Sequence, residues 1–412
     1  MISKATRITT LMALGLSASA LAFAQDSAES GTINQVQMGD IWSDMDVYVP
    51  DYTPEVSSTS VAMGNSAAAV RKSGDINAEI SQTFDANATA TNRLRGYSAD
   101  TAAATTTAYG NAVTGGTAYG TNYTWAKEQI AGGNISASSD IDLLGGAVIT
   151  SATTAMANIS STNTDFGNNY ADQFQYSSAN VEATTDADMC CDGYAATFVT
   201  TAGANATSST GYTATNYNRA LQATEAGSSI RGVTDVYMND GTNVTAATTS
   251  FGNSATVENE WGYATLGQQG APTVQQNSAE IDAQTYVTLD HWSGYATASA
   301  SGVGNSALIS NVGSDTVLYA DQTNDGTVGA QASFTGQSWT GGTGVVTASA
   351  IGNAATATVC NYCSDGAVGG QINQVNSGSV YATGSAHTAF GGAVYGSATA
   401  VGNSATLQSA GD

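Results

Sequence analysis

Aromatic residues recur at one position relative to a short Gly-Asn phrase in the last third of this chain. Trp292, Trp339 and Phe390 each lie 12 or 13 residues before the glycine of such a phrase. If the phrases mark repeats that stack in register, the three rings form one column on one face. Exposed rings are suited to stacking against sugars, whereas buried rings would fill the interior. The spacing leaves both interpretations open.

Other residue types give little support for catalysis or for a metal site. There are two histidines, His291 and His387, and neither has a spacing that links it to a cysteine. No carboxylate pair of the kind that glycosidases use stands out from the acidic background. Asn239-Asp240-Gly241 and Asn324-Asp325-Gly326 resemble fragments of calcium loops, but they fit tight turns better. We therefore predict a protein that is not an enzyme and that has no cofactor and no bound metal.

The four cysteines form two local pairs. Cys360 and Cys363 are separated by two residues and are predicted to close a small disulfide loop if the protein is exported. Cys190 and Cys191 are adjacent, so a bond between them needs distorted geometry and their redox state stays open. A zinc site made of all four cysteines would require the two pairs to meet, although they lie more than three repeats apart.

The charge balance narrows the choice of partners. The chain has 33 acidic and 9 basic residues, and removing Lys4 and Arg7 with an export signal leaves 7 − 33 = −26. No Lys or Arg occurs after Arg231. This excludes nucleic-acid binding, which needs a basic surface. Cationic partners fit better: divalent metals, a basic protein or a polysaccharide with free amines. Alternatively, the acidity only keeps a β-protein soluble.

The N-terminus has the features of an export signal. A basic start and an apolar run precede Ala22-Phe23-Ala24, a small-x-small cleavage site, so residues 1–24 are predicted to be a signal peptide. Residues 25–56 differ from the remainder and are expected to form a cap or docking segment. Residues 57–412 are expected to form one repeat domain.

The repeat itself is a phrase of an apolar or aromatic residue, Gly, Asn and Ser or Ala. Such fixed-period similarity is typical of repeat architectures, which present long surfaces to partners. The copies lie at Gly64-Asn65, Gly110-Asn111, Gly167-Asn168, Gly252-Asn253, Gly304-Asn305, Gly352-Asn353 and Gly402-Asn403, with a degenerate copy at Gly203-Ala204-Asn205.

The residues between these phrases predict strands. Small apolar and hydroxyl residues alternate in Val346–Ile351 and in Tyr295–Ala300, as expected for strands with one buried and one wet face. We predict an all-β, parallel β-solenoid of about seven to eight degenerate repeats of about 50 residues. Gly-Asn is expected to form its corners, because both residues tolerate positive φ. Each repeat is expected to hold two coils of roughly 20–30 residues. Asn and Gln are expected to stack as ladders between coils.

These features together resemble the holdfast anchor family HfaD of stalked bacteria. The resemblance covers nearly the whole chain and includes repeats such as Ala300–Ala307. Curlin-type fibre subunits are a weaker match, in turn chemistry alone. The HfaD resemblance implies an outer-membrane surface protein, at the pole or stalk tip, that tethers an adhesive polysaccharide containing amino sugars. It also implies two partners, a smaller curlin-like anchor subunit and a curli-type outer-membrane export lipoprotein. It supplies no catalytic residues.

Our main prediction is therefore a cell-surface anchor or adhesin that forms multimers. The principal alternative is a self-assembling, amyloid-like matrix subunit. A polysaccharide-cleaving β-helix is the third possibility.

Overall fold

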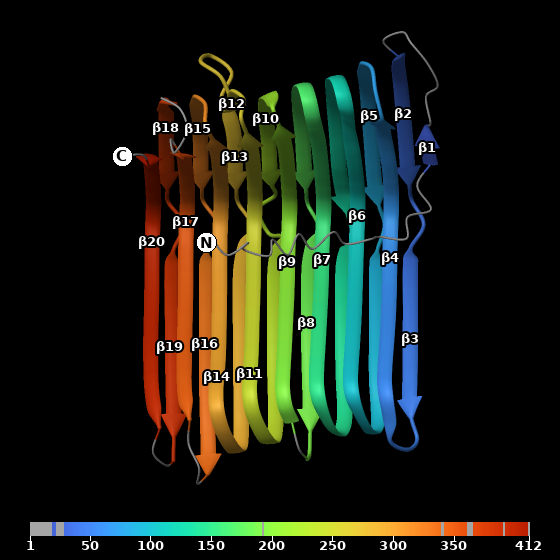
Figure 1. Ribbon diagram of the computed structural model, residues 1–412, viewed down its shortest axis with the longest axis vertical. Helices are drawn as coiled ribbons and strands as arrows, with labels where there is room; N and C mark the ends of the chain where they lie inside the picture. The colour runs from blue at the N-terminus through green and yellow to red at the C-terminus, as the bar shows by residue number, and fades with distance from the viewer. Residues whose placement is uncertain are drawn as a thin grey trace, which may run out of the picture.

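Every secondary-structure element among the described residues is a β-strand in the computed structural model of the protein (Figure 1). The expected signal peptide lies outside the described residues except for Ser19–Leu21, which pair with β4. The residues that the structure describes are 19–21, 29–191, 193–338, 342–360, 366–389 and 392–410.

Parallel pairing joins the strands into one continuous sheet that winds from the N-terminus to the C-terminus. The strands are β1 (Ser19–Leu21), β2 (Glu29–Gln37), β3 (Ile41–Val49), β4 (Thr53–Arg71), β5 (Ile76–Asp85), β6 (Ala88–Gly132), β7 (Asn134–Ser177), β8 (Asn180–Met189), β9 (Gly193–Tyr212), β10 (Ala214–Thr224), β11 (Ser229–Glu260), β12 (Ala264–Leu266), β13 (Thr273–Asn277), β14 (Glu280–Val312), β15 (Thr316–Asn324), β16 (Val328–Ser338), β17 (Thr343–Cys360), β18 (Val368–Asn376), β19 (Val380–Thr388) and β20 (Ala393–Ala410).

Each repeat is one flattened coil. Paired residues of neighbouring coils are 46 residues apart at Asn65 and Asn111, and 53 apart at Leu221 and Val274. A coil contains two short segments, which together form one side, and a long segment that returns along the other side (Figure 1). The prediction of a solenoid is confirmed, but the expected two coils per repeat are wrong, because the long segment continues through the Gly-Asn phrase without turning.

The predicted Gly-Asn corners are also wrong. These phrases lie inside the long segments, where Gly252 and Asn253 are both buried and the inward-outward alternation changes phase. Glycine is needed here for close approach, since a Cβ on Gly304 would collide with the Gly352 carbonyl oxygen and with Asn324 Oδ1. Apart from Gly167, the glycines with positive φ lie outside these phrases, at true corners such as Gly96 and Gly120. The positions expected as corners were Gly64, Asn65, Gly110, Asn111, Gly252, Asn253, Gly304, Asn305, Gly352, Asn353, Gly402 and Asn403.

The asparagines of these phrases form the expected ladder, within strands instead of at turns. Each Nδ2 donates to Oδ1 of the asparagine in the next coil over 2.8–2.9 Å. Its second hydrogen goes to a backbone carbonyl on the opposite side of the coil, as from Asn111 to Gln129. The ladder comprises Asn65, Asn111, Asn158, Asn205, Asn253, Asn305, Asn353 and Asn403.

The sequence pattern assigned the third copy of the phrase to the wrong residues. The third member of the ladder is Asn158, preceded by Ala157, and it bonds to Asn111 and Asn205. Gly167-Asn168 instead lies at a corner, where Gly167 has a φ of 145°. The degenerate copy with Asn205 is a true member of the ladder.

The interior is narrow and combines alanine and larger apolar residues with ordered amides. Alanines such as Ala108 and Ala155 are fully buried, and small residues let the two sides of a coil pack closely. Phe84, Phe198 and Phe334 are among the largest fully buried side chains. Because every amide in the asparagine ladder is hydrogen-bonded, burial of this ladder costs little desolvation energy.

Candidate functional site

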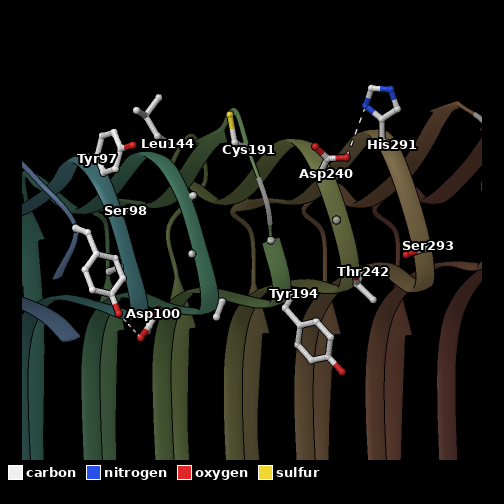
Figure 2. Close-up of a pocket in the computed structure, with 17 residues that line it drawn as sticks. Tyr97, Ser98, Asp100, Leu144, Cys191, Tyr194, Asp240, Thr242, His291 and Ser293 are labelled. Atoms are coloured by element: carbon white, nitrogen blue, oxygen red, sulfur yellow. Dashed lines mark hydrogen bonds and ion pairs between the residues drawn. The ribbon is translucent and has the colours of Figure 1, made fainter. Parts of the chain in front are cut away.

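An open trough runs along the edge of the solenoid that is lower in Figure 1. At this edge the second short segment of each coil is followed by the long segment. The trough has a volume of about 890 Å³ and crosses several consecutive coils (Figure 2). Glycines form its turns; Gly96, for example, has a φ of 137°, which favours glycine. We call this the corner trough, and its lining includes Tyr52, Tyr97, Asp100, Leu144, Cys191, Tyr194, Asp240 and His291.

Carboxylates in the corner trough pair with aromatic and imidazole groups of neighbouring coils. The Tyr52 hydroxyl donates to Asp100 Oδ2 over 2.6 Å, and this bond raises the pKa of the tyrosine. His291 Nδ1 lies 3.7 Å from Asp240 Oδ1, an ion pair only when the histidine is protonated (Figure 2). Both pairs are exposed, so their carboxylates can also accept hydrogen bonds from a ligand.

A row of carboxylates lies on the outer face beside the corner trough. Asp140, Asp186 and Asp235 are register partners on β7, β8 and β11, and Asp142 and Asp188 form a second row two residues further on. Such like-charged neighbours on adjacent strands are unfavourable. Partial burial, followed by the charges of Asp235, Asp140 and Asp188, raises the pKa of Asp186.

Arginines on this face form ion pairs with other acids. Arg231 lies 3.4 Å from Glu182 and 3.8 Å from Asp282, so one cation serves two neighbouring coils. Arg93 on β6 lies 3.5 Å from Asp44 and is the register partner of Asp140 on β7. Within the described part of the chain, no ion pair is found for Asp140, Asp186 or Asp235, so this row, which we call the carboxylate row, is a negative surface with Arg93 beside its Asp140 end.

The aromatic column expected from the sequence is not an exposed surface at its one described member. Trp292 is 1% exposed and packs edge-on against Phe334, with ring centroids 4.9 Å apart. Gly336 leaves room for the indole, since a Cβ there would collide with it. Trp292 thus fills the interior, the second interpretation of the spacing. Trp339 and Phe390 lie outside the described residues.

Two rows of aromatic rings that were not predicted from the sequence lie on the opposite edge of the coils. Tyr119 stacks on Phe166 with centroids 5.2 Å apart, and both rings are substantially exposed. Tyr123, Tyr170 and Tyr217 form a second stack at 4.8 and 5.0 Å. Their spacing of 47 residues is the signal that could have revealed them, because it equals the length of a coil.

This second stack borders a smaller groove of about 450 Å³. Gln268 and Ala271, which form a small antiparallel bridge, line one side of it. Arg219 lies within it, donates to the Pro272 carbonyl and faces Asp172 at 3.9 Å. The groove is therefore more aromatic and less acidic than the corner trough.

The described cysteines form neither a disulfide nor a metal site. Cys190 and Cys191 are exposed, and a hydrogen bond between the two thiols raises the pKa of Cys190. Cys360 is exposed and Cys363 lies outside the described residues, so their disulfide stays a prediction. In the described ranges, no three His, Cys, Asp or Glu side chains are arranged to hold a metal ion. The described residues likewise contain no helix that is long and apolar enough to span a membrane.

Fold and surfaces together define a repetitive β-solenoid whose ligand-accessible features are long open edges instead of an enclosed pocket. A family model described as holdfast attachment protein D, HfaD, matches residues 50–327. This covers more than half of the chain, which therefore belongs to the HfaD family of holdfast attachment proteins and has a role at the cell surface. Comparisons with curated proteins and with solved structures found no match.

Proposed function

We propose that the protein anchors an adhesive, amino-sugar polysaccharide to the outer membrane and binds it along the corner trough and the carboxylate row. The observation that carries this proposal is the carboxylate row, in which Asp140, Asp186 and Asp235 repeat once per coil and form no ion pair among the described residues. Free amines of a polysaccharide are cations that can approach such acids in succession. Many weak contacts along one chain then add up to firm attachment.

The corner trough suits the same ligand. Its carboxylates accept hydrogen bonds from ammonium and hydroxyl groups, and the Tyr97 and Tyr194 rings offer apolar faces. An open trough across several coils accommodates a polymer without enclosing it. Nothing in this arrangement requires a nucleophile or a cofactor, which fits an attachment protein.

Binding to partly deacetylated and to fully acetylated amino-sugar oligomers tests the ligand. We expect the deacetylated oligomer to bind more tightly, and its affinity to fall as salt rises, because exposed charge pairs are screened. The triple variant Asp140→Asn, Asp186→Asn and Asp235→Asn should lose most of this preference. The control variant Asp165→Asn, Glu225→Gln and Glu258→Gln removes the same charge from dispersed sites and should retain it. An equal loss of this preference in both variants would show that it depends on net charge alone.

Deletion in the native host tests the anchoring role. Staining the surface polysaccharide with a fluorescent lectin should show it still produced but released into the medium. Polysaccharide that remains firmly attached would contradict the proposal. The pole or stalk tip as the location, and a curlin-like subunit and an export lipoprotein as partners, belong to this proposal and are tested by labelling and co-purification.

The in-register ladders also fit one alternative function, that of a self-assembling matrix subunit. Amide ladders between parallel strands are also the chemistry of cross-β fibres. Fibre formation and dye binding by the purified protein would favour this alternative, whereas a stable, monodisperse oligomer would favour the anchor.

A further inference from the structure

A second amide ladder runs through the interior from coil to coil, and one of its members is a carboxylic acid. In each glutamine-to-glutamine step, Nε2 of the later coil donates to Oε1 of the earlier coil over 2.7–2.8 Å. The same Nε2 donates to a backbone carbonyl of the facing long segment. The ladder comprises Gln35, Gln82, Glu128, Gln175, Gln222, Gln275, Gln322 and Gln374.

The ladder is incomplete on one side of Glu128. Gln82, Glu128 and Gln175 are consecutive register partners, and Gln175 Nε2 donates to Glu128 Oε2 over 2.7 Å. On the other side, both Glu128 Oε1 and Gln82 Oε1 are buried without a hydrogen-bond partner. Oε1 stands where a glutamine would carry its NH₂ group. One proton on this oxygen would supply the missing donor for Gln82.

Among the described residues, no cation is found to compensate Glu128. The side chains that face it are the amides of Gln82 on β5 and Gln175 on β7, and the backbone of Ile159 is close. Lys127, its neighbour in sequence, is exposed on the outer face. Burial raises the pKa of Glu128 to about 8, although hydrogen bonds from Gln175 and Ile159 act to lower it.

We propose that Glu128 is a proton-operated switch in the glutamine ladder. When protonated, its carboxyl donates from Oε1 to Gln82 Oε1, and the ladder is continuous from Gln35 to Gln374. Loss of the proton to solvent leaves two acceptors face to face. Turning the Gln82 amide would then supply a donor to the carboxylate, but this breaks the bonds from Gln82 to Gln35 Oε1 and to the Ala112 carbonyl. The first coil thereby loses its link through the glutamine ladder, while the asparagine ladder still joins Asn65 to Asn111.

The direction of the pH effect follows from proton binding. In the unfolded chain Glu128 titrates near its ordinary value of 4.5, whereas in the folded protein it holds its proton up to about pH 8. Between these values the folded state binds more protons, so stability falls as pH rises. This contribution is fully present below about pH 4.5 and is lost by about pH 8.

Hydrogen exchange and infrared spectroscopy test the switch on the full chain. Amides of β2 and β5, corrected for intrinsic exchange rates, should lose about tenfold or more of their protection between pH 6 and pH 9. In Glu128→Gln this loss should disappear, and the infrared band of a protonated carboxyl at pH 7 should disappear with it. The variant completes the ladder and is expected to fold.

A second variant separates the switch from general acid sensitivity. Gln222→Glu places a carboxyl at the equivalent position two coils further along, so pH-dependent exchange should also appear in the coils around β10 and β13. Identical pH profiles for wild type and Glu128→Gln, or a protonated-carboxyl band that persists in that variant, would overturn the proposal. None of these readouts depends on polysaccharide binding.

Discussion

Asn205 and Asn253 are joined directly across two neighbouring coils, with Nδ2 of Asn205 lying 2.8 Å from Oδ1 of Asn253. Asn205 also accepts from Asn158 and donates to the Ala223 carbonyl on the opposite side of its own coil. One buried amide therefore ties together three coils and both sides of one of them. This relationship explains why the asparagine recurs in every coil. Ala157 and Ala204 precede it in two copies, whereas in copies such as Gly304-Asn305 the glycine permits the close approach.

Asn205→Ala should destabilise the solenoid by roughly 2–3 kcal/mol, because buried polar groups of Asn158, Asn253 and Ala223 lose a partner. Urea unfolding followed by circular dichroism measures the change in midpoint. Asn168→Ala, at a partly exposed corner position, is the control and should change the midpoint little. A ladder variant as stable as this control would show that the ladder contributes nothing.

Gly304→Ala tests the close approach of the two sides of the coil. The added Cβ would collide with backbone and with Asn324, so we expect a loss of about 1–3 kcal/mol from overpacking. Gly396→Ala lies on a long segment in open space, and its Cβ would meet nothing within 4 Å. Thermal unfolding should separate the two variants clearly, and equal midpoints would contradict the argument from close approach.

Trp292→Ala and Tyr194→Ala should separate stability from binding. Removing the buried indole should cost about 3–5 kcal/mol of folding stability. Tyr194 is 66% exposed in the corner trough, so its replacement should leave stability unchanged within about 0.5 kcal/mol. Unfolding curves and binding to the deacetylated oligomer, measured at a temperature where both variants are folded, should show opposite effects. Weakened binding only in Trp292→Ala would show that the sugar contacts the predicted aromatic column and not Tyr194 in the corner trough.

The strands and ladders could be predicted because they depend on local alternation and on a period of about 50 residues. The corners could not, since Gly-Asn is equally suited to positive φ and to close packing, and only the position of the opposite side of the coil decides which applies. Gly304 shows the outcome: its neighbours across the interior demand the absence of a Cβ, and its φ is unexceptional.

The candidate site was less predictable for the same reason. Whether an aromatic ring faces inward or outward changes with every residue along a strand, so a shift by one reverses the assignment. Trp292 and Tyr123 both recur at the coil period, yet one is buried and the other is exposed. The carboxylate row depends on exact register between β7, β8 and β11, which the irregular lengths of the repeats conceal.

Asp186→Asn should raise stability and weaken binding at the same time. The acid stands between Asp140 and Asp235, and its raised pKa reports partial burial together with their repulsion. Because the group is largely exposed, solvent screens that repulsion, and the gain at pH 7 should be on the order of 0.5 kcal/mol. The gain should shrink as pH falls and Asp186 takes up its proton, and it should shrink with added salt.

Affinity for the deacetylated oligomer should fall in the same variant, since the ligand's amine is the cation that relieves the repulsion in the wild type. Paired measurements of unfolding and of binding by calorimetry, at two salt concentrations, test this coupling. Asp165→Asn is the matched control, because Asp165 lies outside the carboxylate row, and it should change neither quantity appreciably. Higher stability with unchanged affinity would show that the row is acidic for solubility alone. Unchanged stability with lower affinity would place the amine at Asp186 without the electrostatic strain inferred here.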